Sequence, residues 1–223
     1  MTIIAIDGVS ATGKGTLAQK LAQHFNYAFL DTGALYRTVG YRMHQMGLDI
    51  HNETQAVHMV QTLPFKDITV LQTSSSIRTE EVGGYASVVA SMPQVRKALL
   101  DVQRQFALNP VDEKGNPLKG AVLDGRDIGT VICPDADFKF FLTADTKIRA
   151  ERRLKELQLR GKDVILQTVL EEMRERDKRD SQRAVAPVIP AEDAYILDTT
   201  SLTPEEVFAK ALAFIEQEQK SPQ

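Results

Sequence analysis

The stretch that decides the fold is TIIAIDGVSATGKGTLAQKLAQHF, residues 2–25. Residues 2–7 form a short, β-branched apolar run, which is typical of a buried parallel strand. A glycine-rich loop follows, and then Leu17, Leu21 and Phe25 recur four residues apart, as on the apolar face of a helix. A strand, a glycine loop and a helix in this order are the setting in which such a loop binds phosphate groups.

The loop GVSATGKGT, residues 8–16, departs from the pattern G-x-x-x-x-G-K-[ST] at one position. Its glycines let backbone N–H groups approach phosphate oxygens, and Lys14 reaches the outer phosphates. Gly15 follows Lys14, and the hydroxyl comes only at Thr16, about 100° further round the helix. We therefore expect magnesium to be held by the phosphates and by water, with no direct protein ligand. The alternative for the loop alone is a glycine-rich turn with a solvated lysine.

Four further apolar runs each end at an aspartate or threonine beside a loop, and helical segments separate them. They predict an α/β fold, a doubly wound five-stranded parallel sheet flanked by helices, with ligands at the carboxyl ends of the strands. Near the C-terminus, Thr203 and Glu206 form a capping box that begins a helix with an apolar face up to Ile215. The four runs are residues 27–34, 120–125, 138–144 and 194–200.

Two segments interrupt this alternation. Residues 53–92 contain alternating stretches and a serine-rich turn, which predict a small antiparallel insert. Residues 146–179 contain two basic helices, the first ending at Gly161, which we expect to close over anionic substrates as a mobile lid. The whole chain, 1–223, is thus interpreted as one domain with a core at 1–52, 93–145 and 180–223.

The composition limits the compartment and the partners. The net charge is −3, so no strongly basic field indicates nucleic acid as a partner. Cys133 is the single cysteine, so an intramolecular disulfide is excluded and a reducing compartment is favoured. Asp7 and Gly8 interrupt the first apolar run, and no run of 18 uncharged apolar residues follows elsewhere. We expect a cytoplasmic protein without a membrane partner.

Charged residues follow the predicted strands where a phosphoryl group would lie. Arg37 and Asp31 follow the second strand, and Arg126 follows Asp124 after the third. Phosphoryl transfer depends on cations placed around the migrating group, so these loops suit such a reaction. A solvated salt bridge is the alternative for any one of these residues.

The densest charge cluster is RERDKRDSQR, residues 174–183. If the preceding helix continues through it, Arg176, Asp180 and Arg183 stand at i, i+4 and i+7 on one face. The neighbouring helix adds arginines of its own. The alternative for this cluster is a charged surface in contact with water. The neighbouring arginines are Arg149, Arg152, Arg153 and Arg160.

Several sequence blocks together resemble the bacterial cytidylate kinase family of nucleoside monophosphate kinases, which transfer the terminal phosphoryl group of ATP to CMP or dCMP. The likeness extends from about Thr2 to Ile215, and the G-K-G-T ending of the loop is a form that this family uses. The blocks are GVSATGKGTLA, FLDTGALYR, ASVVASMPQVRKAL, AVLDGRDIGTVICPDADFKFFLTA, RERDKRDSQRAVAPVIPAEDA and LDTTSLTPEEV.

The resemblance implies a role for each matching residue. Arg126, Arg176 and Arg183, with Lys14, form the implied catalytic set. The ATP phosphates are implied to lie against Gly8, Val9, Ser10, Ala11, Thr12, Gly13, Lys14, Gly15 and Thr16. The implied CMP contacts are Ser87, Arg96 and Asp127 with the base, Thr32, Arg37 and Arg126 with the phosphate, and Arg176 and Asp180 with the ribose and its phosphate.

The implied base contacts make chemical sense. An arginine donates to the acceptor atoms of cytosine, and a carboxylate accepts from its amino group, which uracil lacks. One departure from the family is the insert ITVLQTSSSIRTEEV, residues 68–82, which is several residues shorter than expected. Because of this shorter insert, the resemblance predicts the preference between CMP and dCMP less directly than it predicts the reaction type.

The interpretation is a monomeric, magnesium-dependent kinase of pyrimidine nucleotide metabolism that makes CDP and dCDP by direct in-line transfer. Two alternatives stay open. One is a kinase of the same fold that acts on UMP, AMP or a non-nucleotide alcohol. A kinase for an alcohol would have no use for Ser87, Arg96 and Asp127 as residues that read a base. The other is a phosphate-loop module that holds ATP without transferring its phosphoryl group.

Overall fold

The computed structural model describes residues 1–64, 74–112, 114–182 and 186–220. The chain divides into two compact units, which are treated separately. Unit 1 comprises Met1–Phe29 and Pro110–Gln223, and unit 2 comprises Leu30–Asn109. The boundary between the two units falls within the second strand. Among the described residues, no helix is both long and apolar enough to cross a membrane.

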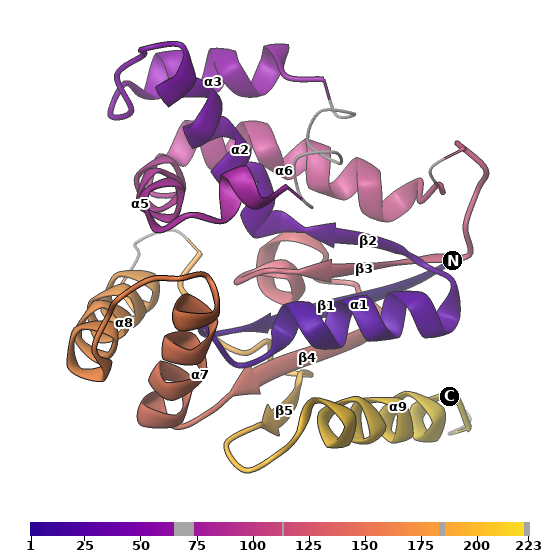
Figure 1. The fold of residues 1–223 in the computed structure, drawn as a ribbon. Helices are drawn as coiled ribbons and strands as arrows, with labels where there is room; N and C mark the ends of the chain where they lie inside the picture. The colour runs from indigo at the N-terminus through magenta and orange to yellow at the C-terminus, as the bar shows by residue number, and fades with distance from the viewer. Residues whose placement is uncertain (65–73, 113, 183–185, 221–223) are drawn as a thin grey trace. The chain divides into compact units, whose positions relative to one another are not determined.

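The sheet has five strands in the order β2-β3-β1-β4-β5 (Figure 1). β1 pairs in parallel with β3 and with β4, and β4 pairs in parallel with β5. The predicted five-stranded α/β fold is therefore confirmed. Because β1 is central, its residues Ile4, Ala5 and Ile6 are buried, and its carboxyl end leads directly into the phosphate loop. The strands are β1 (Thr2–Gly8), β2 (Ala28–Asp31), β3 (Gly120–Asp124), β4 (Phe138–Thr143) and β5 (Tyr195–Asp198).

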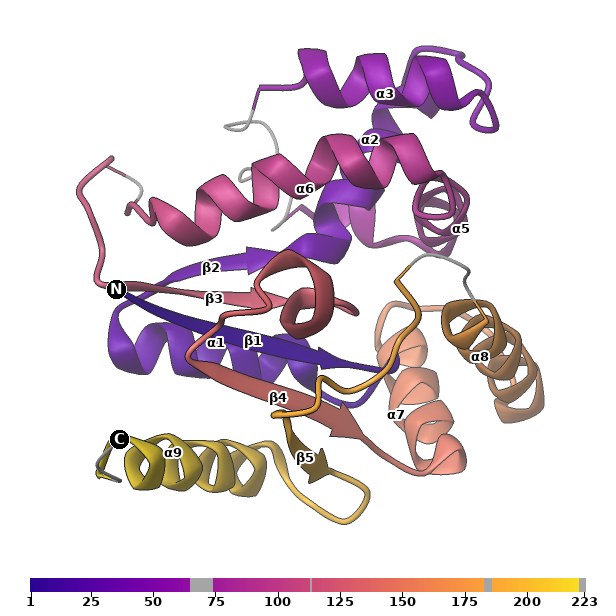
Figure 2. The same cartoon turned by 180° about the vertical axis from the view of Figure 1, so that it is seen from behind.

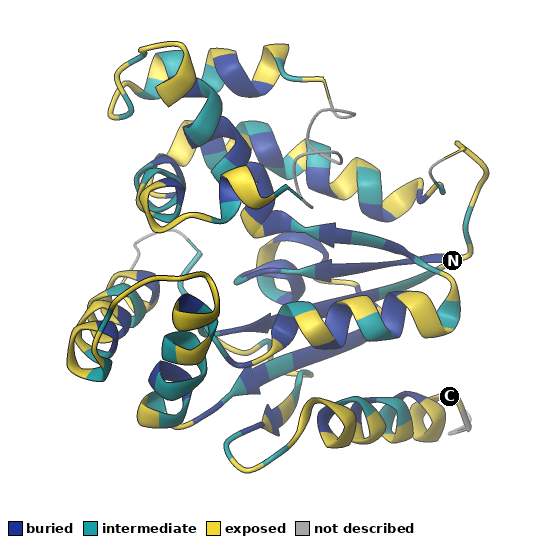
Figure 3. Cartoon of the chain, viewed as in Figure 1, coloured by how far each residue is buried: buried dark blue, intermediate teal, exposed yellow. Residues whose placement is uncertain are grey.

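Helices α1 (Lys14–Phe25) and α9 (Pro204–Lys220) pack together in unit 1. Their buried side chains join those of β1, β4 and β5 in one apolar core, visible as dark ribbon in Figure 3. The predicted capping box begins α9: Thr203 N donates to Glu206 Oε2 at 2.8 Å, and Glu206 N donates to Thr203 Oγ1 at 3.3 Å. The short π-helix η2 (Ile128–Ile132) packs against β1, on the side of the sheet opposite α1 (Figure 2).

Helices α7 (Thr146–Leu159) and α8 (Leu166–Ser181) pack against each other in unit 1 through a small apolar cluster. Gly161 follows α7 with a positive φ of 73°, a conformation that suits glycine after a helix end. α8 ends at Ser181 with Gln182 as its C-cap, so the condition under which Arg183 would share a helix face with Arg176 and Asp180 is not met. Arg183 itself lies outside the described residues.

In its described residues, unit 2 is helical after the end of β2. α2 packs on α5, where Gly40 permits the approach because a Cβ at residue 40 would stand 2.7 Å from the Tyr85 Cβ. Its elements are α2 (Thr32–Gln45), α3 (Glu53–Thr62), the 3-10 helix η1 (Ser75–Arg78), α5 (Glu80–Val89) and α6 (Pro93–Leu108).

The antiparallel insert predicted for residues 53–92 is wrong for its described part, which is helical. The serine-rich turn is a helix start: Ser74 Oγ accepts from Ser76 N, and Thr79 Oγ1 accepts from Val82 N at the beginning of α5. Residues 65–73, which include the start of the alternating stretch, lie outside the described residues. The predicted limits of the insert and of the lid stay predictions.

Candidate active site

The phosphate loop leaves β1 through a close contact that only glycine permits. A Cβ on Gly8, whose φ is 139°, would overlap the Leu142 carbonyl oxygen of the neighbouring strand. Within the loop, Thr12 Oγ1 donates to the Val9 carbonyl at 3.0 Å, and Lys14 Nζ donates to the same carbonyl at 2.7 Å. The side chain of Lys14, at the start of α1, thus folds back over the backbone of the loop.

Lys14 is a buried cation among other cations. Its side chain is only 6% exposed, and its pKa is lowered to about 7, first by burial and next by the charge of Arg126. Arg176 lowers this pKa as well, while Asp124 and Asp7 oppose the effect. The positive charges of Lys14, Arg126 and Arg176 therefore interact with one another beside the phosphate loop. This arrangement favours a polyanionic ligand.

The structure gives a physical reason for Gly15. A Cβ at residue 15 would stand 3.2 Å from Asp124 Oδ2, so a side chain there would crowd that carboxylate. Asp124 is the last residue of β3, and Thr16 is exposed. Carboxylate oxygens suit magnesium, which usually keeps several waters and the substrate phosphates as ligands. The residues at this point fit such an ion, although no group of three His, Cys, Asp or Glu within the described ranges forms a metal site of its own.

The DGRD segment after β3 is joined to helix α8. Arg126 Nε donates to Asp180 Oδ2 at 3.2 Å, and Asp180 is buried although it lies near the end of a charged helix. This ion pair brings Arg126 beside the helix that also carries Arg176. The structure thus gathers Lys14, Arg126, Arg176 and Asp180, four residues that the sequence predicted for the site, in unit 1.

Asp7 is a buried residue of this region that the sequence analysis did not propose for the site. Its Oδ1 accepts from Ile128 N at 2.8 Å and its Oδ2 accepts from Gly129 N at 2.7 Å. Burial is the main cause that raises its pKa to about 6, and the two N–H groups act in the opposite direction. In the sequence, the signal for Asp7 was a single carboxylate at the end of an otherwise apolar strand. The sequence analysis interpreted this carboxylate only as an interruption of the apolar run.

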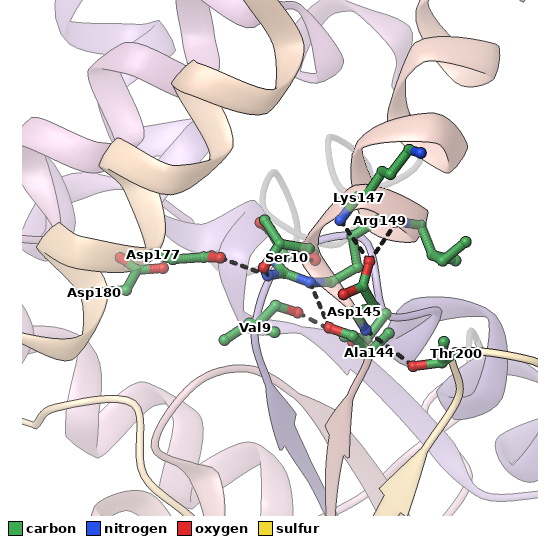
Figure 4. Close-up of polar contacts among 12 residues, drawn as sticks. Val9, Ser10, Ala144, Asp145, Lys147, Arg149, Asp177, Asp180 and Thr200 are labelled. Carbon is green, nitrogen blue, oxygen red and sulfur yellow. Dashed lines mark hydrogen bonds and ion pairs between the residues drawn. The ribbon is translucent and has the colours of Figure 1, made fainter. Parts of the chain in front are cut away.

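Arg149 joins three segments near the loop (Figure 4). Its Nη1 donates to the Ser10 carbonyl at 3.3 Å, and its Nη2 lies 2.7 Å from Asp177 Oδ2 on α8. Nε donates to the Ala144 carbonyl at 3.0 Å, so the guanidinium is buried and bound on all sides. The sequence grouped Arg149 with the cations of the predicted lid, whereas in this structure Arg149, on α7, connects the phosphate loop with α8.

The other arginines of α7 are also engaged within unit 1. Arg152 donates to Thr199 Oγ1 at 3.1 Å and to the Thr199 carbonyl at 2.5 Å. Thr199 Oγ1 in turn donates to the Thr12 carbonyl at 3.0 Å, so Arg152 supports the phosphate loop through the segment after β5. Arg153, on α7, and Arg160, the C-cap of that helix, both pair with Glu156.

The residues predicted to bind the acceptor divide between the units. Unit 2 carries four of them: Thr32 at the start of α2, Arg37 on α2, Ser87 on α5 and Arg96 on α6. Arg37 Nη1 donates to the Ile77 carbonyl at 3.2 Å, and the guanidinium of Arg96 lies 5.8 Å from the centre of the Tyr36 ring. Unit 1 carries the others, Arg126, Asp127, Arg176 and Asp180.

A second ion pair stands beside the predicted phosphate contacts of unit 2. Arg78 Nη2 lies 2.9 Å from Asp31 Oδ2, and Asp31 Oδ1 accepts from Ala34 N as the N-cap of α2. Arg78 was not proposed from the sequence. Its position in the serine-rich segment gave no periodic signal, because that segment folds as a short 3-10 helix.

Comparison with known proteins agrees with this chemistry. The family model described as cytidylate kinase matches residues 4–217. The cytidylate kinase of Paramagnetospirillum magneticum is 51% identical over 214 residues, which cover 96% of this chain and 97% of that protein. The cytidylate kinase of Rhodospirillum rubrum is 50% identical over 94% of this chain and 95% of its own length. The crystal structure of an uncharacterized protein from Eubacterium ventriosum has a TM-score of 0.51 at 17% identity, covering 99% of this chain and all of that one, which shows a shared fold.

Proposed function

The chain belongs to the cytidylate kinase family and is a (d)CMP kinase, and on that premise we propose how its residues divide the work of the reaction. The activity is transfer of the terminal phosphoryl group of ATP to CMP or dCMP, which gives ADP and CDP or dCDP. The observation that supports the proposal most strongly is the buried Lys14, whose pKa is lowered to about 7 with Arg126 and Arg176 among the causes.

We assign the donor side to the phosphate loop. The backbone from Gly8 to Thr16 would surround the ATP phosphates, and Lys14 would bond the outer ones. The favourable interaction is large because Lys14 is already stripped of water and placed among cations before ATP arrives. Bound with ATP, Mg²⁺ would neutralise charge on the phosphate oxygens. Asp124, beside Gly15, would hold one of its waters.

The chemistry needs positioning more than acid–base catalysis. An oxygen of the acceptor phosphate attacks the terminal phosphorus of ATP, and the bond to the bridging oxygen of ADP breaks in line with it. The attacking oxygen already carries negative charge, so no strong general base is required. Arg126 and Arg176 would stabilise the charge that spreads over the migrating group, with the Arg126–Asp180 ion pair fixing the direction of the first guanidinium.

We assign the acceptor side to the residues that follow from the family likeness. Ser87, Arg96 and Asp127 would read cytosine, while Thr32 and Arg37 would join Arg126 at the acceptor phosphate. Asp180 would contact the ribose hydroxyls, since its carboxylate is held in place by Arg126. Replacing Asp180 with alanine should therefore reduce kcat/KM for CMP more than for dCMP. Equal losses for the two nucleotides in the same assay would contradict a ribose contact.

We also place the enzyme in the cytoplasm as a monomer. The support for this compartment is the single cysteine, which excludes an intramolecular disulfide. The net charge of −3 gives no strongly basic field that would favour nucleic acid as a partner. Size-exclusion chromatography with light scattering tests the oligomeric state. A stable dimer at micromolar concentration would contradict it.

The decisive experiment is an acceptor panel in a coupled ADP-release assay. With saturating ATP and Mg²⁺, CMP and dCMP should exceed UMP, AMP and shikimate by at least about tenfold in kcat/KM. Uracil and shikimate offer no amino donor to Asp127, and adenine carries its amino group on a larger, two-ring base. A higher value for UMP or AMP would contradict the acceptor assignment. ATP binding without turnover of any acceptor would instead favour a regulatory module.

Arg183 is proposed to stabilise the transferring phosphoryl group, although it lies outside the described residues. Arg183→Ala should lower kcat by about 10³-fold, the upper range for losing one charge-stabilising donor. The ATP dissociation constant, measured by calorimetry, should stay close to that of the unaltered enzyme. Weaker ATP binding with unchanged kcat would argue for a ground-state contact instead.

A further inference from the structure

The carboxylate of Asp7 holds the backbone that follows the DGRD segment. Its two oxygens accept from the adjacent N–H groups of Ile128 and Gly129 at 2.8 and 2.7 Å. These residues come directly after Arg126 and Asp127 in the chain, and Asp7 lies more than 120 positions earlier in the sequence. The contact is therefore a tertiary one, made by the central strand with the segment that carries a predicted base contact.

The segment that Asp7 anchors, residues 127–132, also forms hydrogen bonds within itself. The Asp127 carbonyl accepts from Val131 N at 2.9 Å and from Ile132 N at 3.1 Å, so Asp127 belongs to the same compact turn as η2. Movement of Ile128 and Gly129 away from Asp7 would consequently move the Asp127 backbone too. Asp7 and Asp127 are both buried, which leaves little water to replace a lost hydrogen bond.

Only a carboxylate satisfies both N–H groups. Two neighbouring donors need two acceptor oxygens, whereas the amide of asparagine has the same shape but offers one oxygen and one NH₂ group. One N–H of the pair would then face another donor in a buried setting. Gly129 makes the approach possible, because a Cβ there would stand 3.2 Å from the Lys139 Cδ and 3.5 Å from Asp7 Oδ2.

We infer that Asp7 is a positioning residue for acceptor selection: by fixing the backbone of η2, it holds Asp127 where a cytosine amino group can be recognised. This inference rests on the proposed function, in which Asp127 accepts from that amino group. Asp7 acts through Asp127 and does not touch the nucleotide. It therefore contributes to the preference for CMP over UMP rather than to the transfer step itself.

Replacing Asp7 should affect ATP binding much less than it affects acceptor selection. Asp7 is the last of the four charges that influence Lys14, after Arg126, Asp124 and Arg176. Replacing Asp7 with a neutral residue thus removes a minor attraction from Lys14, while it breaks one of the two bonds that hold η2. A larger effect on the acceptor than on ATP follows from the geometry.

The experiment compares Asp7→Asn with Asp137→Asn as a matched control. Asp137 Oδ2 accepts from Ile3 N at 2.7 Å, so the control removes a carboxylate bonded to the backbone at the opposite end of the same strand. For Asp7→Asn, the ratio of kcat/KM for CMP to that for UMP should fall about tenfold, as expected when a buried donor loses its acceptor. The KM for ATP should change by less than about threefold. The control should keep the ratio of the unaltered enzyme.

A second variant covers the case in which Asp7→Asn does not fold. Gly129→Ala keeps every charge but pushes the same backbone away from Lys139 and Asp7, and it should also lower the CMP to UMP ratio. In a double-mutant cycle, Asp7→Asn should lower the ratio little further once Asp127→Ala is present, because both act through one contact.

The outcomes separate the inference from the proposed function. A lower melting temperature with an unchanged CMP to UMP ratio in both variants would make Asp7 a structural residue and overturn the inference, while the proposed function would stand. Additive losses in the double-mutant cycle would also overturn it. If the unaltered enzyme showed no preference for CMP, the acceptor assignment itself would fail, and the inference would fall with it.

Discussion

Lys14 and Lys139 are both buried in unit 1, yet their surroundings are opposite. Lys14 bonds a backbone carbonyl and stands among arginine charges, which together with burial lower its pKa to about 7. Lys139, on β4, is 9% exposed and places its Nζ 2.9 and 2.7 Å from the two oxygens of Asp193. The second lysine is paired with a carboxylate of its own protein, whereas the ammonium form of the first is disfavoured until an anionic ligand binds. Of these two lysines, the one that contacts a backbone carbonyl lies in the site, and the one that is paired with Asp193 supports the scaffold.

Replacing Lys14 and Lys139 in turn is the strongest test of this difference between the two lysines. Lys14→Met should lower kcat/KM by about 10²–10³-fold, because a preorganised donor to the phosphates is lost. It should also raise the melting temperature, since an unfavourably buried charge disappears. Lys139→Met keeps the length of the side chain and should leave kcat/KM within about threefold. Steady-state kinetics and thermal unfolding measure both variants.

The opposite pattern would reverse the assignment of the two lysines. If Lys139→Met removed activity and Lys14→Met did not, the paired lysine would be the functional one. A lower melting temperature for Lys14→Met would show that the loop needs its ammonium for folding, which would contradict the reading of Lys14 as a desolvated charge.

The sequence predicted Lys14, Arg126 and Arg176 but neither the contacts of Asp7 nor those of Arg149, and the reason is physical. Strands and helices follow from local apolar periodicity, so β1, the phosphate loop and α1 were all predicted at residues 2–25. The bond from Asp7 to Ile128 joins positions 121 apart, and no local pattern encodes such a distance. The same holds for Arg149, whose pairing with Asp177 depends on how α7 and α8 pack.

Helix ends show the other limit of prediction. Thr203 and Glu206 were recognised because a capping box has a fixed spacing. The serine-rich segment was interpreted as a turn between strands, because serine favours caps and turns equally and only the following helix decides between them. The spacing of Arg176, Asp180 and Arg183 would place them on one face only if the helix continued to residue 183, whereas α8 ends at Ser181.

The lowered pKa of Lys14 predicts an affinity for ATP that is linked to proton binding. Bound phosphates favour the ammonium form, so ATP binding should draw a proton onto Lys14 wherever it is neutral, which is above pH 7. ATP affinity should then decrease with rising pH by up to about tenfold per unit between pH 7.5 and 9. Calorimetry in buffers of different ionisation enthalpy should detect nearly one proton taken up at pH 8.5.

The sign for folding is the reverse. The pKa of Lys14 is lower in the folded, ATP-free protein than in the unfolded chain, so the unfolded chain binds more protons between pH 7 and about 10.5. Stability of the ATP-free enzyme should thus increase with pH in that window. Lys14→Met should abolish this increase and the proton uptake. Persistence of the uptake in Lys14→Met would assign it to another group.

Breaking the pair of Lys139 should affect stability and not the reaction. Asp193→Asn leaves a buried ammonium without its carboxylate, but Asp193 itself is largely exposed and screened by water. We expect a loss of about 1 kcal/mol in the free energy of unfolding at pH 7, or a few degrees in the melting temperature. Lys139 lowers the pKa of Asp193, so the contribution is present above the pKa of the unfolded aspartate and is lost as pH falls below about 4.

A double variant serves as the control for this pair. Lys139→Met with Asp193→Asn should recover stability relative to Asp193→Asn alone, because no unpaired buried charge remains. Both variants should retain CMP turnover. A loss of turnover in Asp193→Asn would mean that the support of Gly129 by the Lys139 side chain extends to the acceptor site.

The smallest expected effect concerns Gly15, which separates Lys14 from the displaced hydroxyl of the loop. Gly15 lies in α1 without a positive φ, so serine is allowed by the backbone, and it should favour the helix slightly. Its Cβ would stand 3.2 Å from Asp124 Oδ2, so the carboxylate must shift by a few tenths of an ångström. Gly15→Ser should keep kcat within about threefold and lower the Mg²⁺ concentration for half-maximal activity by about twofold, because the hydroxyl restores the usual ligand. Gly15→Ala adds the same crowding without the hydroxyl, so it should keep the Mg²⁺ requirement of the unaltered enzyme. If both variants lost more than tenfold in kcat, the position of Asp124 would be the critical feature, and Gly15 would serve to make room for that carboxylate beside the cations that surround Lys14.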